Sequence, residues 1–171
     1  MESTEKSLVG VRFYKVSDEL GLDRAKVSRI IKTYIELNRA DLLSGRVIRF
    51  LGLVSVEPDV ITSCHISTLA MQCKRVSDIL SMPYQTCLVT IKQYMCYLKQ
   101  ELSEGAVVDI RSIVSMHPYY NKGEYSGVQS SVSVSIKRDL KELNGDVTCV
   151  RVHTCKLLKQ LILTRKEVVS L

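Results

Sequence analysis

The sequence contains two copies of one segment, offset by 60 residues. Residues 15–58 align with residues 75–118 without a gap, and apolar character persists at further positions, such as Phe50 with Ile110. Two copies that keep the same apolar positions keep one kind of core, so the repeat decides the expected fold. We therefore expect a tandem duplication with a C-terminal tail. The identical pairs are Val16/Val76, Ser17/Ser77, Asp18/Asp78, Leu20/Leu80, Ile31/Ile91, Lys32/Lys92, Tyr34/Tyr94, Leu42/Leu102, Gly45/Gly105, Val47/Val107, Val54/Val114, Ser55/Ser115 and Pro58/Pro118.

Each copy combines a helical apolar pattern with a strand-like segment. Apolar residues recur at i, i+3, i+4 and i+7 over about five turns and stop at Gly45 or Gly105, a residue type that ends helices. Residues 46–56 and 106–116 then have β-branched, strand-like composition, with Gly52 or Ser112 as the expected bend or hairpin point. The prediction is an α+β fold in which each copy is a short helix, a long helix and a β-hairpin. The helical positions are Val27, Ile30, Ile31, Tyr34, Ile35 and Leu42, and then Cys87, Ile91, Tyr94, Met95, Leu98 and Leu102.

Residues 16–31, VSDELGLDRAKVSRII, have the layout of a DNA-reading helix-turn-helix, with a glycine turn and an Asp-capped second helix. The apolar stripe nevertheless continues to Leu42, which is too far for a recognition helix, and the second copy has Pro-Tyr-Gln in place of Asp-Arg-Ala. Lys26, Arg29 and Lys32 are therefore interpreted as a solvated helix face rather than as base-reading residues.

The order and spacing of these elements resemble the HU/IHF family of bacterial histone-like proteins. Matches in the first copy are the turn Gly21, Leu22 and Asp23, the second turn at Gly45, and the hairpin segment 47–57 (VIRFLGLVSVE). Matches in the second copy are Gly105, Ile110, Ser115 and Met116. The resemblance implies units that intertwine and carry two-stranded arms that wrap the DNA minor groove. One such unit is too small to bury its own apolar face, so two in one chain imply a single-chain pseudo-dimer.

The rest of the chain departs from that family. Too few residues separate Pro58 from the second copy for a DNA-embracing arm. After Pro118, residues 119–129 (YYNKGEYSGVQ) form a candidate short arm that lacks the basic, proline-tipped motif of the family. The alternating segment 130–140 is expected to be a strand.

The final stretch is expected to contain a helix with Leu157, Leu158, Leu161 and Ile162 on its apolar face. The resulting domains are an HU/IHF-like unit at residues 1–62, a second at 63–120, and a C-terminal strand-helix extension at 121–171 that completes the second unit.

The net charge of +6 lies mainly in residues 121–171. It permits a nucleic-acid partner but lacks the dense Lys/Arg stripes that phosphate neutralisation usually requires. No apolar run reaches membrane-spanning length and the N-terminus is too polar for a secretory signal, so we expect a chain that stays in the cytosol, that of a host cell included.

The six cysteines contain no C-x-x-C pair and are expected to be buried free thiols. Cys64 lies next to His65, and His153 lies near Cys155. Neither pairing has the third group that orients a catalytic base or the full ligand set of a zinc site.

These features predict a non-enzymatic protein with no cofactor and no metal site. Similarity to the HU/IHF-fold ring proteins of crAss-like tailed phages implies a structural virion protein, assembled in the host cytoplasm, in the neck or collar between portal and tail. It implies a homo-oligomer that contacts portal or tail proteins. The expected protein-interface residues are Tyr119, Tyr120, Tyr125, Leu158 and Leu161.

The alternative is an architectural, non-sequence-specific DNA-binding protein of the HU/IHF type, located in the cytoplasm or nucleoid, that binds double-stranded DNA. In that case the phosphate contacts are expected from Arg46, Arg49, Arg111, Lys122, Lys137 and Arg138.

Overall fold

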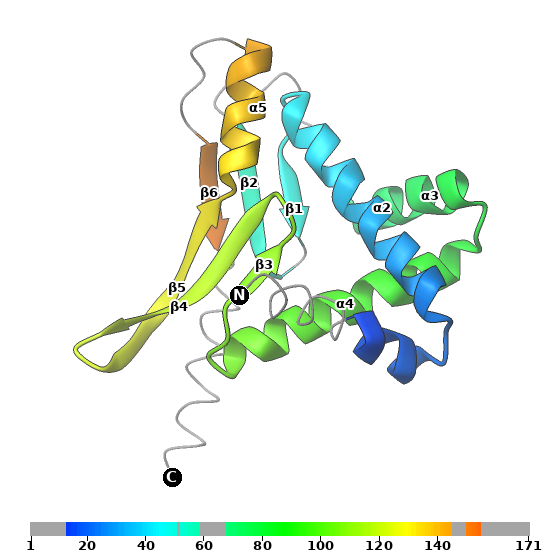
Figure 1. Cartoon of the computed structure of the whole chain (residues 1–171), viewed down its shortest axis with the longest axis horizontal. Coiled ribbons are helices and arrows are strands. Elements are labelled where there is room, and N and C mark those ends of the chain that lie inside the picture. Colours follow the sequence, from blue (N-terminus) through cyan, green and yellow to red (C-terminus); the bar gives the residue numbers. More distant parts are fainter. Residues whose placement is uncertain (1–12, 51, 59–67, 145–149, 155–171) are drawn as a thin grey trace. The chain divides into compact units, whose positions relative to one another are not determined.

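A computed structural model describes residues 13–50, 52–58, 68–144 and 150–154 of the 171-residue chain (Figure 1). The chain forms two compact units, each described by itself below. The helical unit takes its described residues from 1–37 and 68–97, and the sheet unit takes its described residues from 38–67 and 98–171. Each sequence copy therefore contributes to both units, so the expected division at residues 62 and 120 does not coincide with the compact units.

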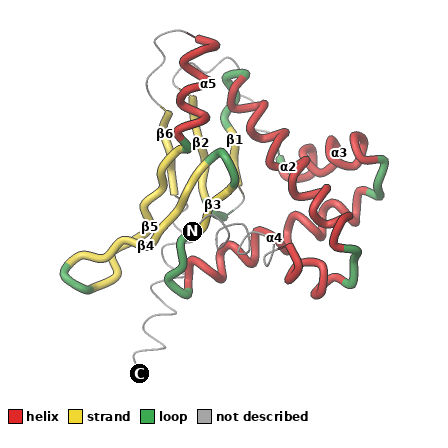
Figure 2. Tube along the Cα trace, in the orientation of Figure 1, coloured by secondary structure: helices red, strands yellow, loops and turns green. Residues whose placement is uncertain are grey.

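Two helix pairs, one from each copy, form the helical unit (Figure 2). In the first copy, a helix at residues 13–20 precedes α2 (Arg24–Leu43). In the second copy, α3 (Leu69–Leu80) precedes α4 (Tyr84–Ser103), and the Thr68 hydroxyl caps α3 by accepting from the Met71 amide at 3.2 Å. The predicted order of a short helix and a long helix is confirmed in both copies.

The turn between the two helices has the same hydrogen bonds in both copies. The Ser17 and Ser77 hydroxyls each donate to the carbonyl five residues later. The backbone turns through a positive φ at Gly21 (63°) and at Ser81 (51°). Glycine adopts this conformation without steric cost, whereas serine does so with strain. The second copy therefore keeps the turn of the first copy even where it has lost the glycine.

The long helices bury the residues that the periodicity singled out. All twelve predicted helical core positions are buried, and the sequence of buried, half-buried and exposed residues over 31–40 is repeated over 91–100. Both helices end at a glycine with nearly the same conformation, Gly45 at φ 87° and Gly105 at φ 88°. The two copies thus share the burial pattern of their long helices and the backbone conformation of the glycine that follows each helix.

Two antiparallel three-stranded sheets form the core of the sheet unit. The strands are β1 (Ile48–Phe50), β2 (Val54–Pro58), β3 (Val108–Ile110), β4 (Val114–Asn121), β5 (Glu124–Val132) and β6 (Val150–Thr154). The register of the first hairpin, in which Ile48 pairs with Val56, is that of the second, in which Val108 pairs with Met116. The structure is therefore α+β, as predicted.

The third strand of each sheet comes from a different part of the chain. Strand β5 follows β4 directly and pairs with it, whereas β6, at residues 150–154, returns to pair with β2 of the first copy. Along the chain, the second copy is thus inserted between two paired strands of the first sheet, β2 and β6. The C-terminal extension was expected to complete the second unit. Its strand β6 instead completes the first sheet.

Residues 130–140 are not one strand, which corrects the prediction for this segment. Strand β5 ends at Val132, and α5 (Val134–Asn144) follows. Ile136 and Leu140 are buried at helical spacing, whereas Val134 is 81% exposed, so the Val-Ser alternation does not mark a buried strand face. The expected helix with Leu157, Leu158, Leu161 and Ile162 lies outside the described residues.

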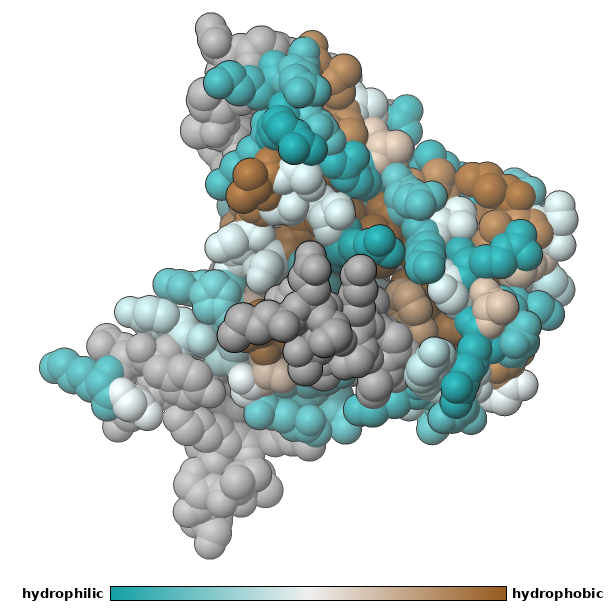
Figure 3. Space-filling view, in the orientation of Figure 1, coloured by the Kyte–Doolittle hydropathy of each residue, from teal (hydrophilic) through white to brown (hydrophobic). Residues whose placement is uncertain are grey.

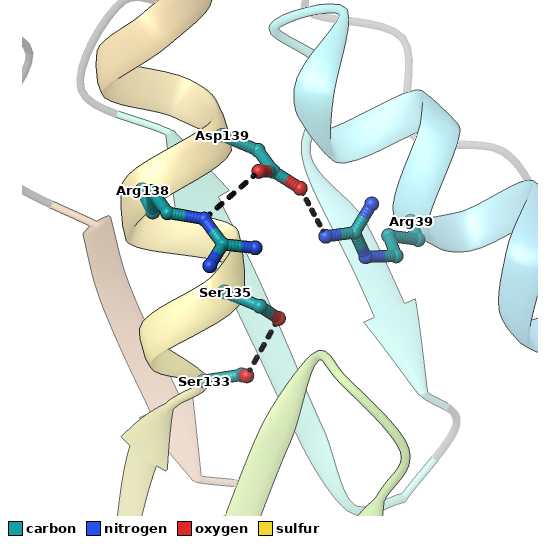
Figure 4. A network of polar contacts seen from close by, with 5 residues as sticks. All are labelled: Arg39, Ser133, Ser135, Arg138 and Asp139. Carbon is teal, nitrogen blue, oxygen red and sulfur yellow. Dashed lines mark hydrogen bonds and ion pairs between the residues drawn. The ribbon is translucent and has the colours of Figure 1, made fainter.

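An ion-pair cluster joins α5 to the last part of α2. Asp139 accepts a hydrogen bond from the Arg39 guanidinium, and its other carboxylate oxygen lies 3.6 Å from Arg138 Nε (Figure 4). The Arg39 hydrogen bond holds the pKa of the Asp139 carboxyl below its usual value, with a smaller contribution from Arg138. This cluster links the long helix of the first copy to the helix that follows β5 in the C-terminal extension.

Asp139→Asn is expected to remove a stabilising contribution that depends on pH. Because the folded pKa of Asp139 is lowered, its contribution is present above the unfolded value of about 3.9 and is lost as pH falls through the folded pKa. The melting-temperature difference between wild type and Asp139→Asn should narrow between pH 7 and pH 3, as measured by circular dichroism. Glu142→Gln, an exposed change on the same helix, is the control. A difference that stays constant with pH would contradict this assignment.

Candidate interaction surface

The longest projection from the sheets is the β4–β5 hairpin, which we call the arm (residues 117–129). Strand β3 pairs with β4 only as far as Met116, whereas the β4–β5 pairs continue from His117 with Gln129 to Asn121 with Glu124. Figure 1 shows this hairpin as a two-stranded ribbon. The predicted short arm after Pro118 is therefore present as a β-hairpin.

The arm ends in a tight two-residue turn. Lys122 and Gly123 both have positive φ, 52° and 81°, as the favoured hairpin turns with matching twist require. A register shift lies between Tyr119 and Tyr120. Such bulges increase strand twist and disturb the edge of a ribbon, which limits uncontrolled pairing with other strands.

The chemistry of the arm is polar, aromatic and almost uncharged. Between Ser112 and Ile136 the charged side chains are those of Lys122 and Glu124. Tyr119 is 42% exposed, and the His117 ring lies 3.1 Å from the Gln129 side-chain oxygen across the ribbon. The arm therefore offers hydrogen bonds and an aromatic ring to a partner, but almost no charge for phosphate neutralisation.

The cations proposed for DNA binding are all exposed but are dispersed over separate elements of the sheet unit. Arg46 lies 3.6 Å from the Asp41 carboxylate, and Arg138 belongs to the Asp139 cluster, so two of the six face a carboxylate. The other four lie on β1, beside the β3–β4 turn, at the arm tip and on α5; these are Arg49, Arg111, Lys122 and Lys137. The described structure does not gather them into one stripe.

The expected protein-interface residues are only partly described. The backbone of Tyr120 and Tyr125 lies in the arm, where the two residues pair across the strands. Tyr119 is the member of the set whose side-chain exposure is described. Leu158 and Leu161 lie outside the described residues.

Two contacts of the sheet unit have no local sequence signal. His153 on β6 lies 3.8 Å from Glu57 on β2, and a Cβ at Gly52 would meet the Lys99 side chain. Both join residues far apart in the chain, so periodicity could not indicate them. Comparison of the two copies could have helped with the second contact, because Lys99 is the counterpart of Arg39, which also contacts a residue far away in the chain, Asp139.

The cysteines divide into two kinds. Cys73 and Cys87 are buried free thiols, as expected, whereas Cys96 is exposed, which corrects the prediction for that residue. Cys96 occupies the solvent face on which the first copy carries exposed Glu36. Burial, and secondarily Cys87, raises the pKa of the Cys73 thiol to about 11, and burial raises that of Cys87, so both are protonated, weak nucleophiles at neutral pH.

No group of His, Cys, Asp and Glu side chains suited to a metal ion occurs among the described residues. Cys64, Cys149 and Cys155 lie outside them, as does His65. Nor does any described helix combine the length and the apolar character that crossing a membrane requires.

Apolar side chains are exposed in both units. In the helical unit they include Met71 and Ile79, at 58% and 59% exposure, and in the sheet unit Val134 and Leu143. Figure 3 shows brown residues interspersed with teal ones over α3 and α5. Scattered apolar residues are ordinary on protein surfaces, so they mark no binding patch by themselves.

Comparison of the chain with protein-family models, with curated proteins and with solved structures finds no match.

Proposed function

We propose that the chain is a single-chain pseudo-dimer of two HU/IHF-like units. The repeated turns, helix ends and hairpin registers support two equivalent units. Contacts between the copies support their pairing within one chain. These contacts are Phe13 with Tyr94 (ring centroids 6.0 Å apart) and the Tyr97 hydroxyl donating to the Lys15 carbonyl (3.4 Å). Arg39 with Asp139 joins the first copy to the C-terminal extension, and Ser130 Oγ with Thr154 Oγ (3.0 Å) joins β5 of the second sheet to β6 of the first.

The function that follows is a non-enzymatic structural role in a protein assembly. The observation that carries this proposal is the arm: it occupies the place of an HU/IHF arm but carries a single cation, Lys122, beside Glu124. An arm that wraps DNA depends on phosphate contacts from several Lys and Arg side chains. A neutral ribbon with an exposed tyrosine suits a protein partner, because tyrosine is enriched in protein interfaces.

By analogy with HU/IHF-fold ring proteins of tailed phages, the assembly we propose is a ring in the neck or collar of a virion, with portal or tail proteins as neighbours. The ring would be a homo-oligomer. Architectural DNA binding remains the competing function, favoured by the exposed cations Arg49, Arg111 and Lys137.

Tyr119→Asp is expected to reduce self-association, because it places a charge on the exposed ring position of the arm. Size-exclusion chromatography with light scattering over a range of concentrations should show a multimer for wild type and a shift toward monomer for Tyr119→Asp. Val134→Asp changes an 81% exposed residue outside the arm and should leave the multimer intact.

The same preparations decide between the two functions when they are titrated into labelled duplex DNA at low and near-physiological salt. Weak or absent binding at low salt supports the structural role. Tight binding that falls steeply with salt, together with a monomeric wild-type protein, would overturn it in favour of DNA binding.

A further inference from the structure

The outer face of the first half of α2 carries three cations, which we call the cationic stripe (Lys26, Arg29 and Lys32). All three are exposed. At 100° per residue they fall within about a third of the helix circumference, opposite the buried stripe that includes Val27 and Ile30. The cations therefore point to solvent together.

The stability of α2 does not account for these charges. The positive end of a helix dipole is at its N-terminus, where acidic residues stabilise and cations destabilise. The first turn of α2 has no acidic residue, and its last turn has no basic one. Asp23, directly before α2, supplies an acidic residue at that end, but the cations of the stripe lie in the first half of the helix, where the dipole does not favour them.

The second copy shows that the fold does not require them. The counterparts on α4, a helix that follows the same turn, are Thr86, Val89 and Lys92; Thr86 and Val89 are half-buried, whereas Lys26 and Arg29 are exposed. One scaffold thus carries three cations in one copy and one cation in the other. The repeated helix therefore forms without cations at two of these three positions.

We propose that the cationic stripe is a docking site for an acidic segment of another protein. The stripe spans about 9 Å along the helix, which suits three carboxylates spaced three or four residues apart on a partner helix. Duplex DNA is a poorer fit, because its affinity for proteins depends on the number of phosphates neutralised, and three cations neutralise few. Arg24 does not join the stripe, since it stacks on the Tyr14 ring at 4.0 Å. The proposal is independent of the arm.

The test exchanges residues between the copies in the full-length protein. Lys26→Thr with Arg29→Val gives the stripe the residues of the second copy, and Thr86→Lys with Val89→Arg gives α4 those of the first. Lys137→Thr with Lys141→Thr removes the same charge from the exposed face of α5 as the control. The probe is a fluorescein-labelled helical peptide with glutamates at every third or fourth position, followed by fluorescence anisotropy at low salt.

The Lys26/Arg29 variant should bind the peptide about tenfold more weakly than wild type, whereas the α5 control should change binding by less than about twofold. The Thr86/Val89 variant should bind more tightly than wild type, which remains informative if the first variant folds poorly. Equal loss in the α5 control would show a general charge effect and overturn the proposal. So would unchanged binding in both exchanged variants, or a labelled duplex DNA that binds the stripe more tightly than the peptide does.

Discussion

Ending the chain at Asn144 is expected to unfold the first sheet, whereas ending it at Thr154 is expected to preserve that sheet. The two shortened chains differ by the segment that contains β6. In the complete chain β6 pairs with β2 from Val54 with Thr154 to Pro58 with Val150. Cross-strand pairs contribute roughly 0.2–1 kcal/mol each, so their sum is large beside a domain stability of about 5–15 kcal/mol.

Urea denaturation followed by circular dichroism measures the difference. The chain ending at Thr154 should unfold in one cooperative transition, and the chain ending at Asn144 should show a much lower midpoint or no cooperative transition. The same midpoint for both would mean that β6 adds nothing to the first sheet, and the insertion topology would then be wrong.

Phe50→Ala is expected to destabilise the protein by about 3–5 kcal/mol. Phe50 lies on β1 and is fully buried, so truncating its side chain leaves a cavity in the core. Its counterpart Ile110 on β3 is also fully buried, and Ile110→Ala should cost about 2–5 kcal/mol.

Val107→Ala, at a 59% exposed position beside β3, is the control and should change stability by less than about 0.5 kcal/mol. Because Phe50 and Ile110 belong to one compact unit, in which Ser130 on β5 contacts Thr154 on β6, both core variants should lower the midpoint of one common transition. Two transitions, each shifted by one of the variants, would show that the copies fold independently.

The local structure of each copy could be predicted because its signals are local. The apolar periodicity of α2 and α4 lies within single helices, and the helix ends at Gly45 and Gly105 depend on one residue type with a special backbone conformation. Even the bend at Gly52, with φ 74°, could be read from composition. These elements obey short-range rules of packing and backbone sterics.

The failures occurred where distant residues decide the structure. The Val-Ser alternation before Ile136 looks like a strand, but the Ser133 amide donates to the Ile113 carbonyl at 2.8 Å and the chain then begins α5. The pairing of β6 with β2 depends on residues on either side of the whole second copy, so no window of sequence contains it. Cys96 was expected to be buried because cysteine is usually an interior residue, but its position on α4 faces solvent.

The candidate surfaces were predictable to different degrees. The arm was predicted from the Gly- and Tyr-rich segment 119–129 after Pro118, whereas its tight turn at Lys122 and Gly123 was not. Among the candidate cations, Arg46 and Arg138 lie near carboxylates that are close to them in sequence, Asp41 and Asp139. The contact between Asp139 and Arg39 could not be predicted, because it joins elements that are distant in sequence. The cationic stripe of α2 is distinguished from an ordinary charged helix face only by comparison with α4, which has one cation at the three equivalent positions.

The insertion of the second copy between β2 and β6 imposes an order on folding during synthesis. Residues that complete the second sheet and α5 leave the ribosome before β6 does, so the second copy can fold while the first still lacks its third strand. Closing the first sheet then joins Val56 to Val152, a contact of high sequence separation, and such contacts form slowly. The exposed edge of β2 is therefore the segment most vulnerable to aggregation until translation of β6 is finished.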